Sequence, residues 1–398
     1  MRSAARRDTL PPMTRAATVA EVQAVLETAY DPHRAEDWDA VGLVTGDPAD
    51  EVRTILLAVD PTHDVIDEAI AEHADLLVTH HPLLLRPVNS VAATTPKGRA
   101  VHKLISNRVA LITAHTNADA PPGGVSDAMA QALGIDEAEP IAAQPSEPRD
   151  KLVTFVPQAD AGQVIDALAA AGAGDIGAYE RCAYTSPGTG TFRPTQGANP
   201  TIGEIGAVEE VAELRVEMVV PRARRAAVVA ALRGAHPYEE AAFDVYELAA
   251  QPSRSGSGRI GRLAAPTTLG EFATAVVDAL PGTASVARVA GDPDQPVRTV
   301  ALCGGAGDFL LDQVRATDAD VYVTSDLRHH PASELREHGA PALIDVPHWA
   351  AEWTWLPVAE RVLTAALAAQ GITVETRVST IVTDPWTGHV PMIRGAPR

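Results

Sequence analysis

The sequence predicts an α/β fold: two similar α/β halves form one discontinuous domain, and a smaller α+β domain is inserted between them. Three observations lead to this prediction. Short β-branched and aliphatic runs alternate with segments of helical periodicity in both halves of the chain. The later half repeats the plan of the earlier half, and the segment between them orders its elements differently. Strands that alternate with helices favour layers built on a mainly parallel sheet.

The first half is expected over residues 18–150 and begins with a helix. In "TVAEVQAVLETAY", Thr18 is a helix cap, Glu21 follows three residues later, and apolar residues recur with helical spacing. Strands are then predicted in "VRTILLAVD", "ADLLVTHHP" and "VALITAH", with helices in "DVIDEAIAEH" and "KGRAVHKLISNR" between them. Residues 1–17 carry arginines but lack the apolar stretch of a secretory signal, so we expect a disordered extension.

The second half is expected over residues 256–375 and repeats the first. Three short stretches recur in the same order: VRTI (52–55) as VRTV (297–300), ADLLVT (74–79) as ADVYVT (319–324), and ALI (110–112) as ALI (342–344). The interval between the first two stretches is the same in both halves. Three matches in order indicate a duplicated strand–helix–strand unit.

The inserted domain is expected over residues 151–250. The pattern in "KLVTFVPQADAGQVIDALAAAGAG" indicates a strand and a helix, and "AELRVEMVVPRARRAAVVAALRGAHPYEEAAFDVYEL" indicates a strand, a helix and a strand. This order is typical of a ferredoxin-like domain. The Gly/Pro-rich "SPGTGTFRPTQGANPTIGEIG" is expected to join its two parts, and "QPSRSGSG" to lead back to the second half. Residues 376–398 are expected to form a strand-like C-terminal tail that packs on a neighbouring chain.

Composition excludes several classes of function. The formal net charge of -20 argues against nonspecific binding to nucleic acid, which needs a basic surface. No apolar run approaches the roughly 18 residues of a membrane span. Two cysteines, Cys182 and Cys303, are too few for a disulfide framework and are typical of a reducing cytoplasm. We therefore expect a globular cytoplasmic protein.

The polar residues of both halves cluster where predicted strands end, which is where ligands bind in open α/β sheets. They are His80, His81, His115 and Asp119 in the first half, and Asp326, His330, His348 and Glu352 in the second. Imidazole nitrogens and carboxylate oxygens are common ligands of divalent metals. Adjacent strand residues point to opposite faces, so His80 and His81 could reach two ions. His348 and Glu352 are four residues apart and share one face of a helix, from which the glutamate could bridge two ions.

Each of these residues also has an ordinary explanation. A single His-x-x-x-Glu pattern is usually a surface pair, and two adjacent histidines are often incidental. His115 could be a direct ligand, a hydrogen-bond donor behind the ligands, or a polar residue at a strand end. Asp326 could cap a helix and His330 could simply face solvent. The joint placement at strand ends of two matching halves favours a metal site.

Other motifs are weaker signals. "GSGRIG" at 256–261 matches a dinucleotide-binding pattern, but it continues as a strand instead of opening a helix, so we reject that function. "HPYEE" at 236–240 is interpreted as a polar turn. Cys303 ends an apolar run and is expected to be inert packing. The glycines of "CGGAGD" after it could form an anion cradle.

Six motifs in order make the chain resemble the Nif-three-like family, also named GTP cyclohydrolase I type 2 homologues, over residues 18 to 375. They are "DWDAVGLVTGDP", "AVDPT", "LLVTHHPLL", "AHTNADAPPGGVSD", "TSDLRHH" and "IDVPHWAAEW". The family often has Asn where this chain has Ala40, outside the ligand set. The middle segment, with "GTGTFRPTQGANP" and "HPYEEAAFDVYEL", is similar to the CutA-like insert of longer members.

The resemblance implies a dinuclear metal centre. The matching ligand positions are His80, His81, Asp119, His348 and a bridging Glu352; the ions could be zinc, iron, manganese or nickel, and which histidine binds which ion stays open. It also implies that Asp326 and His330 lie near the cleft, as candidates for substrate contact or proton transfer. A toroidal hexamer is the implied assembly.

Two functions are therefore expected. The first is a metal-dependent hydrolase of a nucleotide or a phosphoester-like small molecule, because two ions close together can activate a water and polarise a phosphate. The family name does not select GTP over other nucleotides, and no P-loop pattern is present. The alternative is a non-enzymatic metal-binding scaffold or adaptor ring. A ring that binds nucleic acid is disfavoured by the acidic charge.

Overall fold

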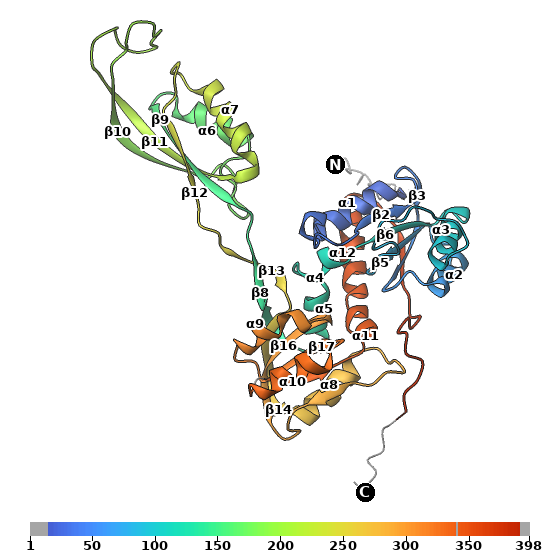
Figure 1. The fold of residues 1–398 in the computed structure, drawn as a ribbon. Coiled ribbons are helices and arrows are strands. Elements are labelled where there is room, and N and C mark those ends of the chain that lie inside the picture. Colours follow the sequence, from blue (N-terminus) through green and yellow to red (C-terminus); the bar gives the residue numbers. More distant parts are fainter. Residues whose placement is uncertain (1–14, 340, 391–398) are drawn as a thin grey trace, which may run out of the picture. The chain divides into compact units, whose positions relative to one another are not determined.

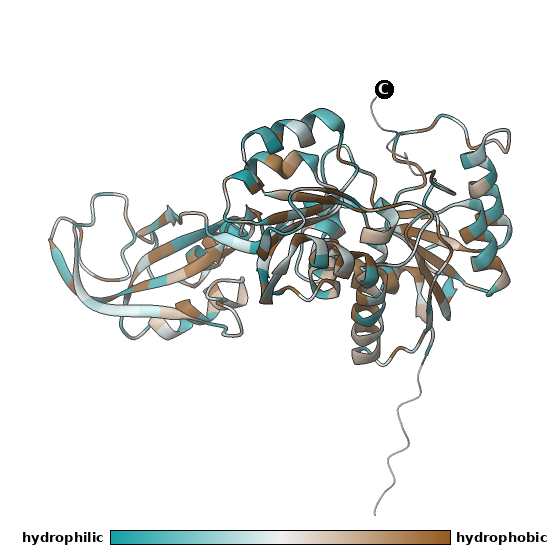
Figure 2. Cartoon of the chain, turned by 90° about the horizontal axis from the view of Figure 1, so that it is seen from below, coloured by the Kyte–Doolittle hydropathy of each residue, from teal (hydrophilic) through white to brown (hydrophobic). Residues whose placement is uncertain are grey.

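The computed structural model describes residues 15–339 and 341–390 of the 398-residue chain. The chain divides into two compact units with a mixed α/β fold and several sheets (Figure 1). Unit 1 comprises the described residues up to Gln144 and those from Arg254 onward, and unit 2 comprises Pro145–Ser253. Apolar residues follow the strands of the sheets, whereas the outer helices carry many hydrophilic ones (Figure 2).

The first sheet of unit 1 has the strand order β19-β4-β5-β6-β2. Its strands are β2 (Gly42–Thr45), β4 (Thr54–Ala58), β5 (Leu76–Thr79), β6 (Ala110–Thr113) and β19 (Glu375–Val378). All neighbours pair in parallel except β2, which runs antiparallel to β6. The strands predicted in the first half therefore form a mainly parallel sheet, as their alternation with helices indicates.

Helices cover both faces of this sheet. They are α1 (Val19–Ala29), α2 (His63–Ala71), α3 (Pro96–Ser106) and α12 (Leu356–Ala369). Ile55 and Ile112 face the side that packs with α1 and α12, whereas Leu56 and Leu77 face α2 and α3. Because both faces are buried, the strands are apolar at successive positions. The α1 capping box between Thr18 and Glu21 is present.

The second sheet of unit 1 has the order β15-β18-β17-β16-β14-β7. Its strands are β7 (Asp136–Glu139), β14 (Arg259–Thr268), β15 (Arg288–Ala290), β16 (Pro296–Ala306), β17 (Val321–Ser325) and β18 (Ala342–Asp345). Helices of this half include α5 (Val125–Ala132), α8 (Leu269–Ala279), α9 (Leu311–Arg315) and α10 (His329–Glu337). The glycine-rich "GSGRIG" runs into β14, and the next helix is α8, so it does not form a dinucleotide-binding turn.

The internal repeat extends to the strand register. Ile55 pairs with Leu76 in the first sheet, and Val300 pairs with Val321 at the corresponding positions of the second. The next pairs, Leu76 with Ala110 and Val321 with Ala342, also correspond. Asp75 and Asp320 each accept two backbone N–H bonds, from residues 53–54 and 298–299 respectively. The duplicated sequence therefore folds into two equivalent three-stranded parallel units.

Unit 2 contains a four-stranded antiparallel sheet of order β10-β11-β9-β12. Its elements are β9 (Arg149–Pro157), α6 (Ala161–Ala170), β10 (Ala183–Phe192), β11 (Glu209–Pro221), α7 (Arg225–Ala235) and β12 (Phe243–Glu247). The β-α-β-β-α-β order agrees with the predicted ferredoxin-like plan. The Gly/Pro-rich segment is partly strand rather than only a connection. β10 lies at the edge of the sheet, where Pro187 does not interrupt an internal ladder.

Short elements complete the chain. They are β1 (Ala17–Thr18), η1 (Pro32–Arg34), β3 (Glu51–Val52), α4 (Thr116–Asp119), β8 (Ala142–Pro145), η2 (Arg222–Arg224), β13 (Pro252–Ser257), η3 (Asp308–Leu310) and α11 (His348–Trp353). No described helix is long and apolar enough to cross a membrane. Burial raises the pKa of the Cys303 thiol to about 12, which keeps it protonated, as expected for a packing residue.

The two ends of the chain differ from the sequence-based expectation where they are described. Of the expected extension over 1–17, residues 1–14 lie outside the described residues, and Ala17 pairs with Val52. The expected packing of the tail on a neighbouring chain stays a prediction; within its own chain, β19 joins the first sheet beside β4. Farther along, Thr383 hydrogen-bonds to Asp60. The tail therefore packs at least in part on its own unit, and residues 391–398 lie outside the described residues.

Candidate metal centre

The candidate site lies where strands of unit 1 end. His80 and His81 follow β5 directly, and His115 and Asp119 follow β6, with Asp119 closing α4. His348 and Glu352 lie on α11, which follows β18 of the second sheet. The two halves of unit 1 therefore supply different side chains to one cluster, as the polar pattern at strand ends predicted.

Glu352 is the centre of this cluster. Its carboxylate is 3.4 Å from His80 Nε2, 3.0 Å from His81 Nε2 and 2.7 Å from His348 Nε2. Asp119 Oδ1 lies 3.6 Å from His80 Nε2. Glu352 is only 4% exposed and His80 is fully buried, so water competes little for these groups.

Each of the four histidines has its Nδ1 atom beside an oxygen. For His80 it is the carbonyl of Ala114 at 2.9 Å; for His81, His115 and His348 it is a carboxylate, of Asp60 at 2.6 Å, Asp39 at 2.7 Å and Asp326 at 2.7 Å respectively. An Nδ1 that donates a proton leaves the Nε2 lone pair available. Such outer hydrogen bonds are characteristic of histidines that bind metals.

The inner atoms lack hydrogen-bond partners. The buried Nε2 atoms of His80 and His348 and Oε2 of Glu352 approach neighbouring ligand atoms closely, but none of these contacts within the described residues has hydrogen-bond geometry. The ligand atoms of His80, His81 and His115 lie within 4.8 Å of one another, and so do those of His81, His348 and Glu352. Buried polar atoms normally find partners. Cations held by these two groups would provide partners for the unpaired nitrogen and oxygen atoms. The donor set therefore fits divalent metal ions.

The pKa shifts show that the cluster attracts positive charge. Burial alone would lower the pKa of a histidine, but Glu352 and Asp60 raise that of His81 to about 11. Glu352 and Asp326 likewise raise the pKa of His348 to about 10. Burial would raise the pKa of Glu352, yet the neighbouring histidines hold it well below its ordinary value. Without a metal, protons on His81 and His348 provide the positive charge.

Two further neighbours shape the cluster. Gly305, at the end of β16, has a φ of +69°, and a Cβ atom there would lie 2.5 Å from Glu352 Oε1. Gly305, the second glycine of "CGGAGD", thus leaves space for the Glu352 carboxylate. The ring of Trp355 is fully buried, and its centroid lies 5.4 Å from that of His80.

The structure brings together most of the residues singled out in the sequence. His80, His81, His115, Asp119, His348 and Glu352 share the cluster. Asp326 contacts it through His348, on the side of the ring away from Glu352. His330 does not join it: this exposed residue of α10 packs against His329, and no described contact links it to the cluster.

Sequence reasoning missed the roles of Asp39 and Asp60. Both lie in motifs that the sequence shows, "DWDAVG" and "AVDPT". Asp39 is 76 residues from His115, and Asp60 is 21 residues from His81. Asp39 also accepts hydrogen bonds from Thr116, and these contacts with His115 and Thr116 lower its pKa despite burial. For Asp60, an acidic residue after the buried strand β4 was the available signal, whereas Asp39 lies in the loop before β2, where no such signal exists.

A cavity of about 700 Å³ opens beside the cluster. His81, His348, Asp326 and Arg288 line it. The C-terminal tail contributes residues 383–386, 388 and 389 to its wall. Two of the candidate metal ligands, His81 and His348, therefore border a space large enough for a small molecule.

Comparison with known proteins assigns a family. A family model described as Duf34/NIF3 (NGG1p interacting factor 3) matches residues 17–385. A Mycobacterium tuberculosis relative named GTP cyclohydrolase 1 type 2 homolog is 50% identical over 369 residues, which cover 92% of this chain and 96% of that protein. A Bacillus subtilis relative of the same name is 39% identical and covers 79% of this chain and 84% of its own length.

Solved structures agree with this assignment. The structure of a Bacillus cereus protein related to NIF3 has a TM-score of 0.77 and 36% sequence identity, over 94% of this chain and 99% of that chain. A Staphylococcus aureus structure has a TM-score of 0.80 at 29% identity, with the same coverage. The expected resemblance is thereby confirmed, and the chain belongs to the Duf34/NIF3 family.

Proposed function

We propose that the protein binds two divalent metal ions in this cluster and hydrolyses a nucleotide or another phosphoester-like small molecule. The observation that carries the proposal is the common arrangement of the four imidazoles. Each Nδ1 atom has an oxygen partner, and the Nε2 atoms of His80, His81 and His348 approach one buried carboxylate. This arrangement supports metal binding more than a set of ion pairs, because it leaves nitrogen lone pairs directed inward.

The proposed ligands are His80, His81, Asp119, His348 and Glu352, with Glu352 between the two ions. Two donor groups support two ions; they share His81, whose Nε2 atom would serve one of them. His115 is a sixth donor, because it completes the group of His80 and His81. Imidazole and carboxylate ligands suit zinc, iron, manganese or nickel.

Bound divalent ions would supply Lewis acidity toward a phosphoryl or carbonyl oxygen of the substrate. The residues of the chain do the rest. Asp326 fixes the orientation of His348 through Nδ1, and it lines the cavity, where it can also accept a proton. Arg288 lines the same cavity and offers a guanidinium to an anionic substrate. This guanidinium also donates a hydrogen bond to Asp345. His330 is proposed as a proton carrier only if substrate reaches α10.

Elemental analysis of the full chain, purified without a histidine tag, tests metal binding. We expect about two ions per chain in the wild type and a marked loss in Glu352→Ala, because the carboxylate contacts three of the histidines. Glu334→Ala is the matched control, since Glu334 is an exposed glutamate of α10 outside the cluster. A wild-type chain that takes up no stoichiometric metal after reconstitution would contradict the proposal.

Hydrolysis is tested separately with the metal-loaded chain. The panel contains nucleoside phosphates, phosphomonoesters and phosphodiesters. We expect turnover of at least one member, and a loss of about 100-fold or more in Glu352→Gln. A metal-loaded protein that is inert across the panel would contradict hydrolysis while leaving the metal site intact.

A metal-binding scaffold is the second candidate. It is favoured by unit 2, which has its own sheet, helices and core and contributes no residue to the cluster. A scaffold would act as an assembly, and we propose the hexamer that the family resemblance implies. Light scattering on the purified chain tests this, with six chain masses expected; a monomer at micromolar concentration would contradict it.

A further inference from the structure

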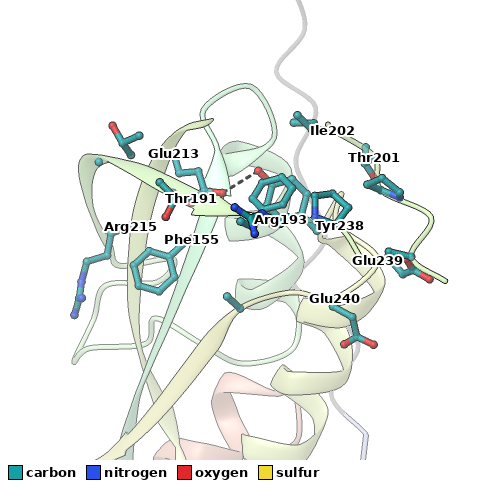
Figure 3. Close-up of a pocket in the computed structure, with 18 of the residues that line it drawn as sticks. Phe155, Thr191, Arg193, Thr201, Ile202, Glu213, Arg215, Tyr238, Glu239 and Glu240 are labelled. Atoms are coloured by element: carbon teal, nitrogen blue, oxygen red, sulfur yellow. Dashed lines mark hydrogen bonds between the residues drawn. The ribbon is translucent and has the colours of Figure 1, made fainter. Parts of the chain in front are cut away.

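Unit 2 contains a cavity that the metal site does not use. Its volume is about 650 Å³, within the usual range for small-molecule sites. Two motifs that the metal site leaves unexplained line it: "GTGTFRPTQGANP" at 188–200 and "HPYEEAAFDVYEL" at 236–248. These segments are separated in sequence by β11 and α7, and Figure 3 shows their side chains around one space.

A buried carboxylate lies in this cavity. Glu213 is 8% exposed and accepts a hydrogen bond of 2.8 Å from the hydroxyl of Tyr238. Its carboxylate lies against Gly190 of the neighbouring strand β10, where an added Cβ atom would collide with it. Burial and the adjacent Glu213 raise the pKa of Tyr238, so the phenol keeps its proton and acts as donor. Two residues thus hold one negative charge in place.

The cationic residue of the cavity is Arg193. It follows β10 directly, and Figure 3 shows it beside Glu213 and Tyr238. Arg193 is exposed and makes no hydrogen bond or ion pair with any described residue. The other arginine, Arg215, is already engaged: its Nε donates to Glu217 at 2.8 Å, and its guanidinium lies over the ring of Phe155. Arg193 is therefore the guanidinium available to a ligand.

The remaining charged residues of the lining are peripheral. Glu239 and Glu240 are exposed, and Glu239 accepts a hydrogen bond from the backbone of Asn199. With Glu213 they make the cavity unsuitable for a polyphosphate or another multiply charged anion, because like charges would approach closely. A purely apolar ligand would leave the buried Glu213 carboxylate uncompensated.

Apolar side chains form the rest of the wall. Phe155 comes from β9, Phe192 from the end of β10 and Ile202 from the following loop. The rings of Phe192 and Tyr238 pack with centroids 5.7 Å apart. The site thus combines one buried carboxylate, one guanidinium without a partner among the described residues, and an aromatic wall.

We propose that this cavity binds a free α-amino acid with a bulky apolar side chain. The ammonium group faces Glu213, the carboxylate faces Arg193, and the side chain packs against the aromatic wall. A zwitterion satisfies both charges at once, and hydrogen bonds to charged groups are among the stronger polar contacts. This site is independent of the metal cluster and of the proposed hydrolysis.

Isothermal titration calorimetry of the full chain with three related probes tests the proposal. L-phenylalanine carries both charges, phenethylamine lacks the carboxylate, and phenylpropionate lacks the ammonium group. We expect saturable binding of L-phenylalanine, with each of the other probes weaker by about tenfold or more. Absence of L-phenylalanine binding up to about 10 mM, or equal binding of all three probes, would overturn the proposal.

Two variants locate the binding. Glu213→Gln should weaken the affinity for L-phenylalanine about tenfold or more and bring it closer to the affinity for phenylpropionate. Arg193→Gln should instead reduce its advantage over phenethylamine, and because Arg193 is exposed this change is compatible with folding. Glu210→Gln, an exposed glutamate of β11 outside the cavity lining, is the control and should bind like the wild type. Binding that survives both cavity variants would place the ligand elsewhere and overturn the assignment.

Discussion

Individual carboxylates outside the ligand set control the geometry of the cluster. Asp39, Asp60 and Asp326 each hold a histidine through Nδ1. A negatively charged acceptor on one ring nitrogen makes the other a stronger metal ligand and fixes the plane of the ring. We therefore expect these aspartates to affect metal affinity without touching a metal.

Asp60→Asn tests this at one histidine. The amide can still accept from His81 Nδ1 but loses the charge, so metal affinity should fall by about 10–100-fold. Competition with a fluorescent chelator measures the change. Asp64→Asn is the control, because Asp64 is an exposed residue of α2 close in sequence. Equal affinities of the Asp60 variant and the wild type would show that His81 does not depend on this contact.

Metal binding should release protons. Without a metal, the raised pKa values of His81, about 11, and His348, about 10, keep both rings protonated at neutral pH. A metal needs their neutral Nε2 atoms, so loading releases about two protons and the apparent affinity rises with pH. Calorimetric titrations at pH 7 in buffers of different ionisation enthalpy measure this release. Heats that do not depend on the buffer would contradict the prediction.

The ligands were more predictable than the residues behind them. His80 and His81 are adjacent, and His348 and Glu352 share a helix face, so local spacing shows both pairs. The contact of His115 with Asp39 joins residues 76 apart, and only the folded sheet brings them together. The sequence also suggested His330 as a site residue, although it lies on α10 away from the cluster contacts.

At the level of secondary-structure elements, the end of β16 packs directly against Glu352. Gly305→Ala places a methyl group 2.5 Å from Glu352 Oε1 and requires a positive φ of a residue with a side chain. The backbone effect should cost about 1–2 kcal/mol of stability, and displacement of the glutamate should lower metal content. Elemental analysis and thermal unfolding measure the two effects.

Gly371→Ala is the control for this substitution. Gly371 has a φ of +73°, and a Cβ atom there meets nothing within 4 Å. It should therefore share the loss of stability but keep its metal. Similar metal loss in both variants would mean that backbone strain, and not contact with Glu352, is responsible.

The main strands were predictable because they are apolar on both faces and recur in both halves. The strands that sequence reasoning missed are edge or polar strands. β10 contains Pro187 and then two glycines and two threonines in alternation (188–191), a pattern typical of a connection, and it becomes a strand by pairing with β11. For β19, the polar "ETRV", the strand-like tail expected from residue 376 includes its last three residues, but its pairing with the free edge of β4 was not predictable. Their pairing depends on distant segments that local patterns do not contain.

At the scale of the whole molecule, a bound metal would connect distant parts of the sequence. His80 and His81 lie beyond the first sheet, whereas Glu352 lies on the helix that follows the second. Ions held by both sets stabilise the folded arrangement of unit 1 by mass action. Unit 2 contributes no residue to the cluster, so bound metal should not change its stability.

Hydrogen exchange with and without chelator tests this difference. On removal of the metal, we expect faster exchange in residues 76–119 and 345–356, which contain the ligands and the elements that carry them. Exchange in β9, β11 and α7 of unit 2 serves as the internal control and should not change. Faster exchange throughout both units would indicate global destabilisation instead of a local metal link.

The contact between Trp355 and His80 gives the cluster an optical reporter. The indole is fully buried and 5.4 Å from an imidazole of the cluster. Trp38 also lies near the cluster, 5.9 Å from the ring of His115, so the contribution of Trp355 is isolated by substitution. Open-shell ions such as manganese, iron or nickel quench the emission of a nearby indole, but the closed-shell zinc ion does not. The emission lost on loading, compared between wild type and Trp355→Phe, therefore distinguishes these classes of ion by light alone.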